Sequence, residues 1–194
     1  KELSTFRLIN SRLQGHPATH EGLPGIRVAS GSLGQGLSVA NGAALGKKMK
    51  GDDFLVYVLM GDGEQQEGQI WEAVQFAPNH QLDNLIAIVD WNLKQIDGPT
   101  DKVNNNRNIK TKYEAFGWLT VDLADGNDID QVKEALIKAK ELRGQGQPIA
   151  IMMHSEMGFG VDYMMHTHKW HGAAPNDEQL AKALEQLPET LGDY

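Results

Sequence analysis

Apolar and polar positions alternate along this chain in blocks that predict buried strands separated by helices. The run "FLVYVL" and the following Met predict a strand over Phe54–Met60, and "NLIAIVD" predicts another over Asn84–Asp90. Both runs are nearly continuously apolar, which is typical of strands in a parallel sheet that is covered on both faces. Two further strands are predicted at Leu119–Leu123 and Gln147–His154.

Helical spacing of apolar residues marks the segments that flank these strands. The pattern predicts helices over residues 1–14, from about Gly34, from Glu64 to about Ala77 where Pro78 ends it, over Lys110–Phe116, after the N-cap Asp128, and from about Asp177. Alternating strands and helices are typical of α/β proteins. We therefore expect a single domain over residues 1–194, with a parallel sheet and helices on both faces.

Composition limits the function classes. The chain has 194 residues, of which 40% are hydrophobic and 23% charged, as in an ordinary globular domain. Its formal net charge of −8 argues against a nucleic-acid partner. The sequence contains no cysteine, which fits a reducing compartment, and we expect a cytoplasmic location. No apolar run approaches the roughly 18 residues of a membrane span, so no membrane association is expected.

Oxygen-bearing side chains follow two of the predicted strands. Asp62 lies between Gly61 and Gly63 directly after the first strand, and Asn92 follows the second. Ligands of open α/β sheets bind beyond the carboxyl ends of the strands, where these two side chains would meet. A carboxylate and a carboxamide suit Mg²⁺ or Ca²⁺, and the following helix N-terminus favours an anion. The pattern favours a magnesium–diphosphate site, although an Asp between two glycines is also a common turn.

Several ordered motifs extend this interpretation over nearly the whole chain. The stretch "GDGEQQEGQIWEA" and the later "LDNLIAIVDWNLKQIDGPT" resemble the thiamin diphosphate fingerprint of transketolases. The segment "GHPATHEGLPGIRVASGSLGQGLSVANGAALG" and the sequences "AFGWLTVDLADGNDID" and "KWHGAAP" are also similar to that family. The length and the "WHGAAP" sequence look most like the N-terminal, diphosphate-binding subunit of a split transketolase.

The resemblance implies a set of cofactor-binding positions. The Mg²⁺ ligands would be the side chains of Asp62 and Asn92 and the backbone carbonyl of Lys94, and Ca²⁺ could replace Mg²⁺. Gly63 and Glu64 would offer backbone N–H groups to the diphosphate of thiamin diphosphate. The full implied cofactor set is Gly31, Leu33, Gly61, Asp62, Gly63, Glu64, Asn92, Ile96 and Met157. Plain core packing is the alternative for Ile96, and helix–sheet packing for the glycines.

Three further positions match catalytic residues of the family. His16 in "GHP" and His171 in "WHG" would reach the substrate, and Glu67 would link two active sites across a subunit interface. Imidazoles suit proton transfer near neutral pH. The alternatives are ordinary loop histidines and a carboxylate that stabilises a helix N-terminus. The spacing of His166, His168 and His171 could suggest zinc, but no Cys supports it.

The sequence also departs from the family pattern. His154 and Ser155 stand where the family often has Lys and Thr, Trp91 where a charged residue is common, and Met157 where an aliphatic residue packs on the cofactor. These departures bear on substrate choice more than on cofactor binding.

The resemblance also implies an incomplete active site. Transketolases move a two-carbon ketol unit from a ketose phosphate to an aldose phosphate, and the glutamate that activates the cofactor lies on a pyrimidine-binding domain. That domain, and an N-terminal segment of the family, have no match here. We therefore expect a C-terminal, pyrimidine-binding partner subunit in a dimer of heterodimers. The alternatives are a component of a 2-oxoacid dehydrogenase or a deoxyxylulose phosphate synthase, and a non-catalytic cofactor-binding subunit.

Overall fold

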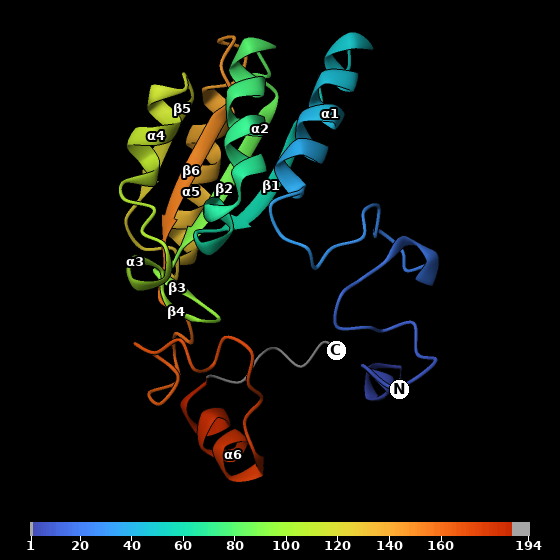
Figure 1. The fold of residues 1–194 in the computed structure, drawn as a ribbon, viewed down its shortest axis with the longest axis vertical. Helices are drawn as coiled ribbons and strands as arrows, with labels where there is room; N and C mark the ends of the chain where they lie inside the picture. The colour runs from blue at the N-terminus through green and yellow to red at the C-terminus, as the bar shows by residue number, and fades with distance from the viewer. Residues whose placement is uncertain (1, 188–194) are drawn as a thin grey trace.

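A four-stranded parallel sheet forms the centre of the protein (Figure 1). The structure is a computed structural model that describes residues 2–187. The strands β1 (Val56–Gly61), β2 (Leu85–Trp91), β6 (Ile149–His154) and β5 (Leu119–Leu123) lie side by side in that order. All neighbouring pairs are parallel. The predicted α/β class and the four predicted strands are therefore confirmed.

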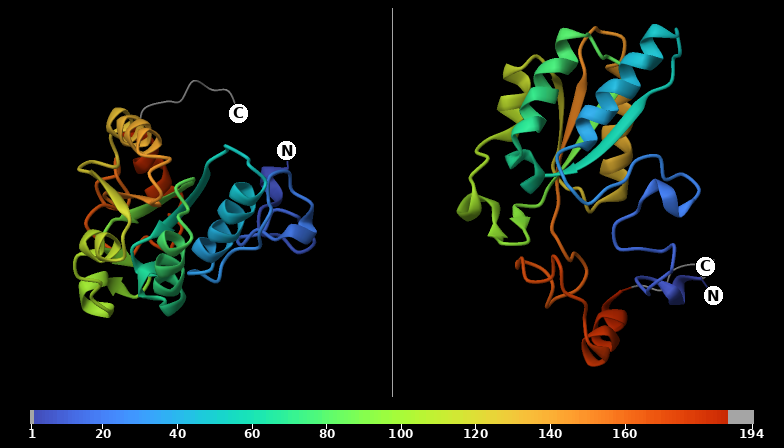
Figure 2. Two further views of the ribbon diagram at one scale, coloured as in Figure 1. Left: turned by 90° about the horizontal axis from the view of Figure 1, so that it is seen from above. Right: turned by 45° about the vertical axis from the view of Figure 1, so that its right-hand side comes forward.

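Helices cover both faces of the sheet, as the sequence predicted (Figure 2). On one face, α1 (Gly36–Met49), α2 (Gly68–Asn79) and α4 (Ile109–Ala115) pack in the larger apolar cluster. On the other face, α5 (Ile129–Glu141) packs against β5 and β6. Successive strand residues point to opposite faces, so Ala87 joins the first cluster and Ile86 the second. This explains why β2 is apolar throughout.

The shorter elements gather mainly beyond the carboxyl ends of the strands (Figure 1). They are the 3₁₀ turns η1 (Leu3–Thr5), η2 (Thr19–Glu21) and η3 (Gly63–Gln66), the hairpin of β3 (Lys94–Gln95) and β4 (Gly98–Pro99), the short helix α3 (Thr100–Val103), and α6 (Asp177–Gln186). This is the end of the sheet at which open α/β proteins bind ligands.

The predicted helix over residues 1–14 is wrong. The structure has only the turn η1 there, and Arg7 and Asn10 adopt left-handed backbone conformations with φ of 62° and 66°. The apolar side chains that suggested the helix are exposed, with Ile9 at 92%. A short helix needs tertiary packing of its apolar face to be stable. In the described part of the chain these residues have no such packing surface, so the spacing alone misled the prediction.

Pro78 does not end its helix where the sequence predicted. Helix α2 continues to Asn79, and Pro78 lies in its last turn. A proline has no N–H to donate to the carbonyl four residues earlier, here that of Val74. The indole N–H of Trp118 donates to that carbonyl instead, at 2.8 Å. A side chain from a distant segment therefore satisfies the acceptor that the proline leaves free.

The predicted helix from Glu64 is divided into η3 and α2. Glu67 lies between the two with an extended backbone, ψ 129°, and is the N-cap residue of α2. The N-cap predicted at Asp128 is confirmed, because its carboxylate accepts the backbone N–H groups of Asp130 and Gln131.

Candidate functional site

Asp62 lies at the carboxyl end of β1 and is almost completely buried, with 1% of its surface exposed. Its Oδ1 accepts the N–H of Gly63 at 2.8 Å, and its Oδ2 accepts the N–H of Leu93 at 2.6 Å. The side chain of Asn106 donates to its backbone carbonyl at 2.6 Å. The carboxylate is thus held in one orientation, against the turn that follows the neighbouring strand.

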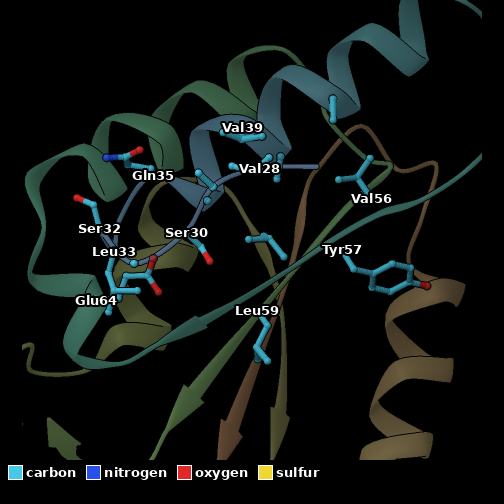
Figure 3. A pocket seen from close by; sticks show the side chains of 16 residues that line it. Val28, Ser30, Ser32, Leu33, Gln35, Val39, Val56, Tyr57, Leu59 and Glu64 are labelled. Atoms are coloured by element: carbon cyan, nitrogen blue, oxygen red, sulfur yellow. The ribbon is translucent and has the colours of Figure 1, made fainter. Parts of the chain in front are cut away.

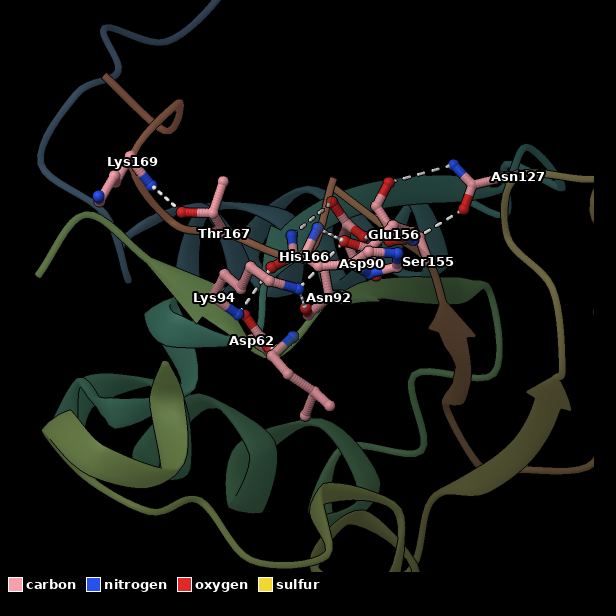
Figure 4. A network of polar contacts seen from close by, with 11 residues as sticks. Asp62, Asp90, Asn92, Lys94, Asn127, Ser155, Glu156, His166, Thr167 and Lys169 are labelled. Carbon is pink, nitrogen blue, oxygen red and sulfur yellow. Dashed lines mark hydrogen bonds and ion pairs between the residues drawn. The ribbon is translucent and has the colours of Figure 1, made fainter. Parts of the chain in front are cut away.

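That turn carries Asn92 and Lys94. Because Gly61 pairs with Asp90 in the parallel register, the ends of β1 and β2 lie side by side. The Oδ1 of Asn92 accepts the N–H of Lys94 at 2.9 Å, and Leu93 between them has a left-handed φ of 64°. Figure 4 shows Asp62, Asn92 and Lys94 close to one another. The structure therefore brings together the three residues that the sequence suggested as metal ligands.

The electrostatics of Asp62 favour a bound cation. Burial raises the pKa of its carboxyl to about 6, the N–H groups of Leu93 and Gly63 oppose this rise, and the nearby Asp90 adds to it. Within residues 2–187, no cationic side chain is among the groups that act on Asp62. Each carboxylate oxygen has a second lone pair beyond the one that its N–H donor uses. A buried carboxylate beside an amide oxygen fits a divalent cation such as Mg²⁺.

Glu64 joins the turn after β1 to the loop that precedes α1. Its Oε1 accepts the N–H of Gly34 at 2.6 Å, and its Oε2 accepts the N–H of Gly61 at 3.1 Å. The sequence suggested a role only for the backbone of Glu64 and gave no sign of this side-chain role. Gly34 has φ 87°, and a Cβ there would lie 2.8 Å from the Cβ of Glu67. Glycine at position 34 therefore permits both the backbone conformation and the close approach.

The loop before α1 also brings His16 and Gly31 together. Gly31 has φ 130°, and a Cβ there would lie 2.8 Å from the Cγ of His16. Both residues are exposed in the chain, and Leu33 is 57% exposed. The close approach at Gly31 that was expected for the cofactor is thus used here by a histidine ring.

An apolar pocket of about 360 Å³ opens between this loop, α1 and β1 (Figure 3). Strand β1 is an edge strand of the sheet, so the pocket lies where no further strand covers it. Its lining includes Val28, Leu33, Val39 and Val56, and the carboxylate of Glu64 lies at one end. The candidate metal site is therefore adjacent to an uncovered apolar surface.

The other predicted site residues lie on exposed segments. His171 and Glu67 are exposed, Met157 is half-buried, and Ile96 is 65% exposed. A Cβ on Gly172 would lie 3.5 Å from the Cδ1 of Ile96, so the segment with His171 approaches the turn between β3 and β4. The structure thus places His171 near Ile96, while His16 lies on the separate N-terminal loop. The roles of these residues stay predictions.

Glu156 is a site residue that the sequence did not indicate. Its Oε1 accepts from the Nζ of Lys94 at 3.2 Å and from the N–H of His166 at 2.6 Å (Figure 4). Partial burial works to raise the pKa of its carboxyl, but these two donors hold it below the ordinary value. Nearby, the hydroxyl of Ser155 bonds to the carboxylate of Asp90. No pattern in the sequence links residues so far apart along the chain.

Two of the residues that depart from the family pattern are neighbours. The ring of His154 stacks on Trp91 with 4.8 Å between the centroids, and its Nε2 lies 3.1 Å from the Oδ1 of Asp122. None of the helices between residues 2 and 187 has the length and apolar character that a membrane span requires.

Comparisons with known proteins identify close relatives. The family model described as "Transketolase, thiamine diphosphate binding domain" matches residues 1–189. One of the two subunits of an apulose-4-phosphate transketolase from Phocaeicola vulgatus is 38% identical over 187 residues, which are 96% of this chain and 65% of that protein. A 6-deoxy-6-sulfo-D-fructose transketolase subunit from a Clostridium species is 39% identical over 163 residues, 84% of this chain and 58% of that protein. The chain thus spans less than two thirds of the length of these relatives.

A solved structure supports the same assignment. A variant of the transketolase from Pichia stipitis aligns with a TM-score of 0.86 at 31% identity, over 94% of this chain and 28% of that one. The fold is therefore the thiamin diphosphate-binding fold of transketolases, as the sequence resemblance implied. Because the family model covers nearly the whole sequence and the relatives agree with it, the chain belongs to the transketolase family and carries the thiamin diphosphate-binding domain of that family.

Proposed function

We propose that this chain is the diphosphate-binding subunit of a two-subunit transketolase. The complete enzyme transfers a two-carbon ketol unit from a ketose phosphate to an aldose phosphate, and it depends on Mg²⁺ and thiamin diphosphate. The observation that carries this proposal is the buried carboxylate of Asp62, which has no cationic partner among the described residues and lies against the turn with Asn92. The cysteine-free sequence leaves a cytoplasmic location as a prediction.

The proposed metal ligands are the side chains of Asp62 and Asn92 and the carbonyl of Lys94, with Ca²⁺ as a substitute for Mg²⁺. The backbone at Gly61, Gly63 and Glu64 borders the diphosphate. When bound, thiamin diphosphate supplies the carbanion that accepts and releases the ketol unit. The protein residues supply the binding site: they neutralise the diphosphate through the metal and hold the turn in place.

The apolar and exposed residues have complementary proposed roles. Gly31, Leu33, Ile96 and Met157 border the cofactor. His16 and His171 bind the substrate oxygens and exchange protons with them, because an imidazole can donate or accept near neutral pH. Glu67, at the N-terminus of α2, lies toward the subunit interface and contributes to proton transfer between sites. The exposure of these groups in the single chain fits a site that a second chain covers.

A partner subunit is the central requirement of the proposal. Two relatives are named as transketolase subunits, and this chain matches them over most of its own length. We propose a C-terminal partner that carries the pyrimidine-binding domain, in a complex with two copies of each chain. The names of the relatives refer to apulose 4-phosphate and to 6-deoxy-6-sulfo-D-fructose. For this chain we propose the wider class of sugar phosphates.

Reconstitution tests the proposal. The purified chain alone should be inactive in a ketol-transfer assay and should bind thiamin diphosphate weakly. Addition of the partner subunit should restore Mg²⁺-dependent transfer with at least one pair of sugar phosphates. Transfer at an ordinary enzymatic rate by the isolated chain would contradict the two-subunit proposal. A complex that binds the cofactor and transfers nothing with any sugar phosphate would favour a non-catalytic subunit instead.

A further inference from the structure

Glu156 connects two segments on either side of the candidate metal site (Figure 4). The first is the turn after β2, because the Nζ of Lys94 lies 3.2 Å from Oε1 of Glu156. The second is the loop after β6, because the same oxygen accepts the N–H of His166, whose backbone is left-handed with φ 60°. The side chain of Asn127 in turn accepts the N–H of Glu156 at 2.7 Å. Glu156 is thus fixed from both sides.

The charge of Lys94 makes this contact important. The carbonyl of Lys94 is one of the proposed metal ligands, and its ammonium lies 3.5 Å from the backbone oxygen of Asn92. The side chain is 14% exposed, so water screens its charge poorly. An unpaired ammonium in this position would repel a divalent cation bound by Asp62 and Asn92. Glu156 supplies the opposite charge.

We infer that Glu156 is a positioning residue that sets the divalent-cation affinity of the site by neutralising and holding Lys94. This inference rests on the proposed function, because it assumes a metal at Asp62 and Asn92. Groups that surround metal ligands commonly change metal affinity about 10- to 100-fold when they are replaced. Glu156 would act in this way through the charge of Lys94, without contact with the metal.

The test is calorimetric titration of Mg²⁺ into the complex of the full chain with its partner subunit, at saturating thiamin diphosphate. Glu156→Gln keeps an oxygen for the N–H of His166 but removes the negative charge. It should weaken Mg²⁺ binding about 10-fold. Lys94→Met should bind Mg²⁺ at least as tightly as the wild type. The double variant, with neither charge, should return to within about threefold of the wild type.

A purely structural role predicts a different pattern. If Glu156 only held the loop, then Lys94→Met would also weaken binding, and the double variant would stay as weak as Glu156→Gln. That result would overturn the inference. Glu141→Gln, a neutralised exposed carboxylate at the end of α5, is the matched control and should leave the affinity unchanged.

The same experiment separates the inference from the proposed function. Absence of Mg²⁺-dependent cofactor binding by the wild-type complex would overturn both. If the wild type binds, Asp62→Ala abolishes binding, and Glu156→Gln binds Mg²⁺ as tightly as the wild type, then only the role of Glu156 is wrong.

Discussion

Replacement of Glu64 by alanine tests how the turn after β1 is held to the loop before α1. The side chain is 9% exposed and accepts the N–H groups of Gly34 and Gly61. A hydrogen bond to a charged group stabilises a protein by about 1.5–3 kcal/mol, and this value applies to buried Gly34. Gly61 is partly exposed, so water can replace its acceptor and the loss there is about 0.5–1 kcal/mol. The free energy of unfolding should therefore fall by about 2–4 kcal/mol.

Equilibrium unfolding in urea measures this loss. Glu64→Gln keeps one carbonyl oxygen as an acceptor, so it should lose about half as much as Glu64→Ala. Glu72→Ala, on the exposed surface of α2, is the control and should change the free energy of unfolding by no more than about 0.5 kcal/mol. If Glu64→Ala is no more destabilising than Glu72→Ala, the carboxylate does not hold the loop before α1 to β1, and the reasoning is refuted.

Three further predictions concern the site and the core. Asp62→Ala should abolish Mg²⁺-dependent thiamin diphosphate binding by the assembled enzyme while the circular dichroism spectrum stays unchanged; calorimetry with wild-type affinity would show that Asp62 is not a ligand. His171→Ala should lower the turnover number about 10²- to 10⁴-fold with the cofactor still bound, and an unchanged turnover number would make it an ordinary loop residue. Trp118→Phe should lower the free energy of unfolding by about 1–3 kcal/mol, because the carbonyl of Val74 loses the indole N–H that donates to it. Pro78→Ala in that background should recover stability by restoring a helical N–H, and a further loss would contradict this explanation.

Regular elements were predictable where local pattern and tertiary packing agree. Strand β5 has the predicted bounds Leu119–Leu123, and Asp128 is the N-cap that its position suggested. Residues 1–14 show the opposite case, because their helical spacing is real but the apolar side chains stay exposed. Periodicity reports which residues could form a buried face. It does not report whether a surface exists to cover that face.

The sequence by itself determined the chemistry of the candidate site. Asp62 and Asn92 each follow an apolar run, and parallel strands necessarily bring their carboxyl ends to one edge of the sheet. Only the tertiary structure decided which groups support that chemistry. Glu64 accepts from a backbone N–H thirty positions earlier, and Glu156 pairs with Lys94 across an even longer stretch of the chain. Such contacts depend on how loops meet in space, and the spacing of residues along the chain carries no signal of it.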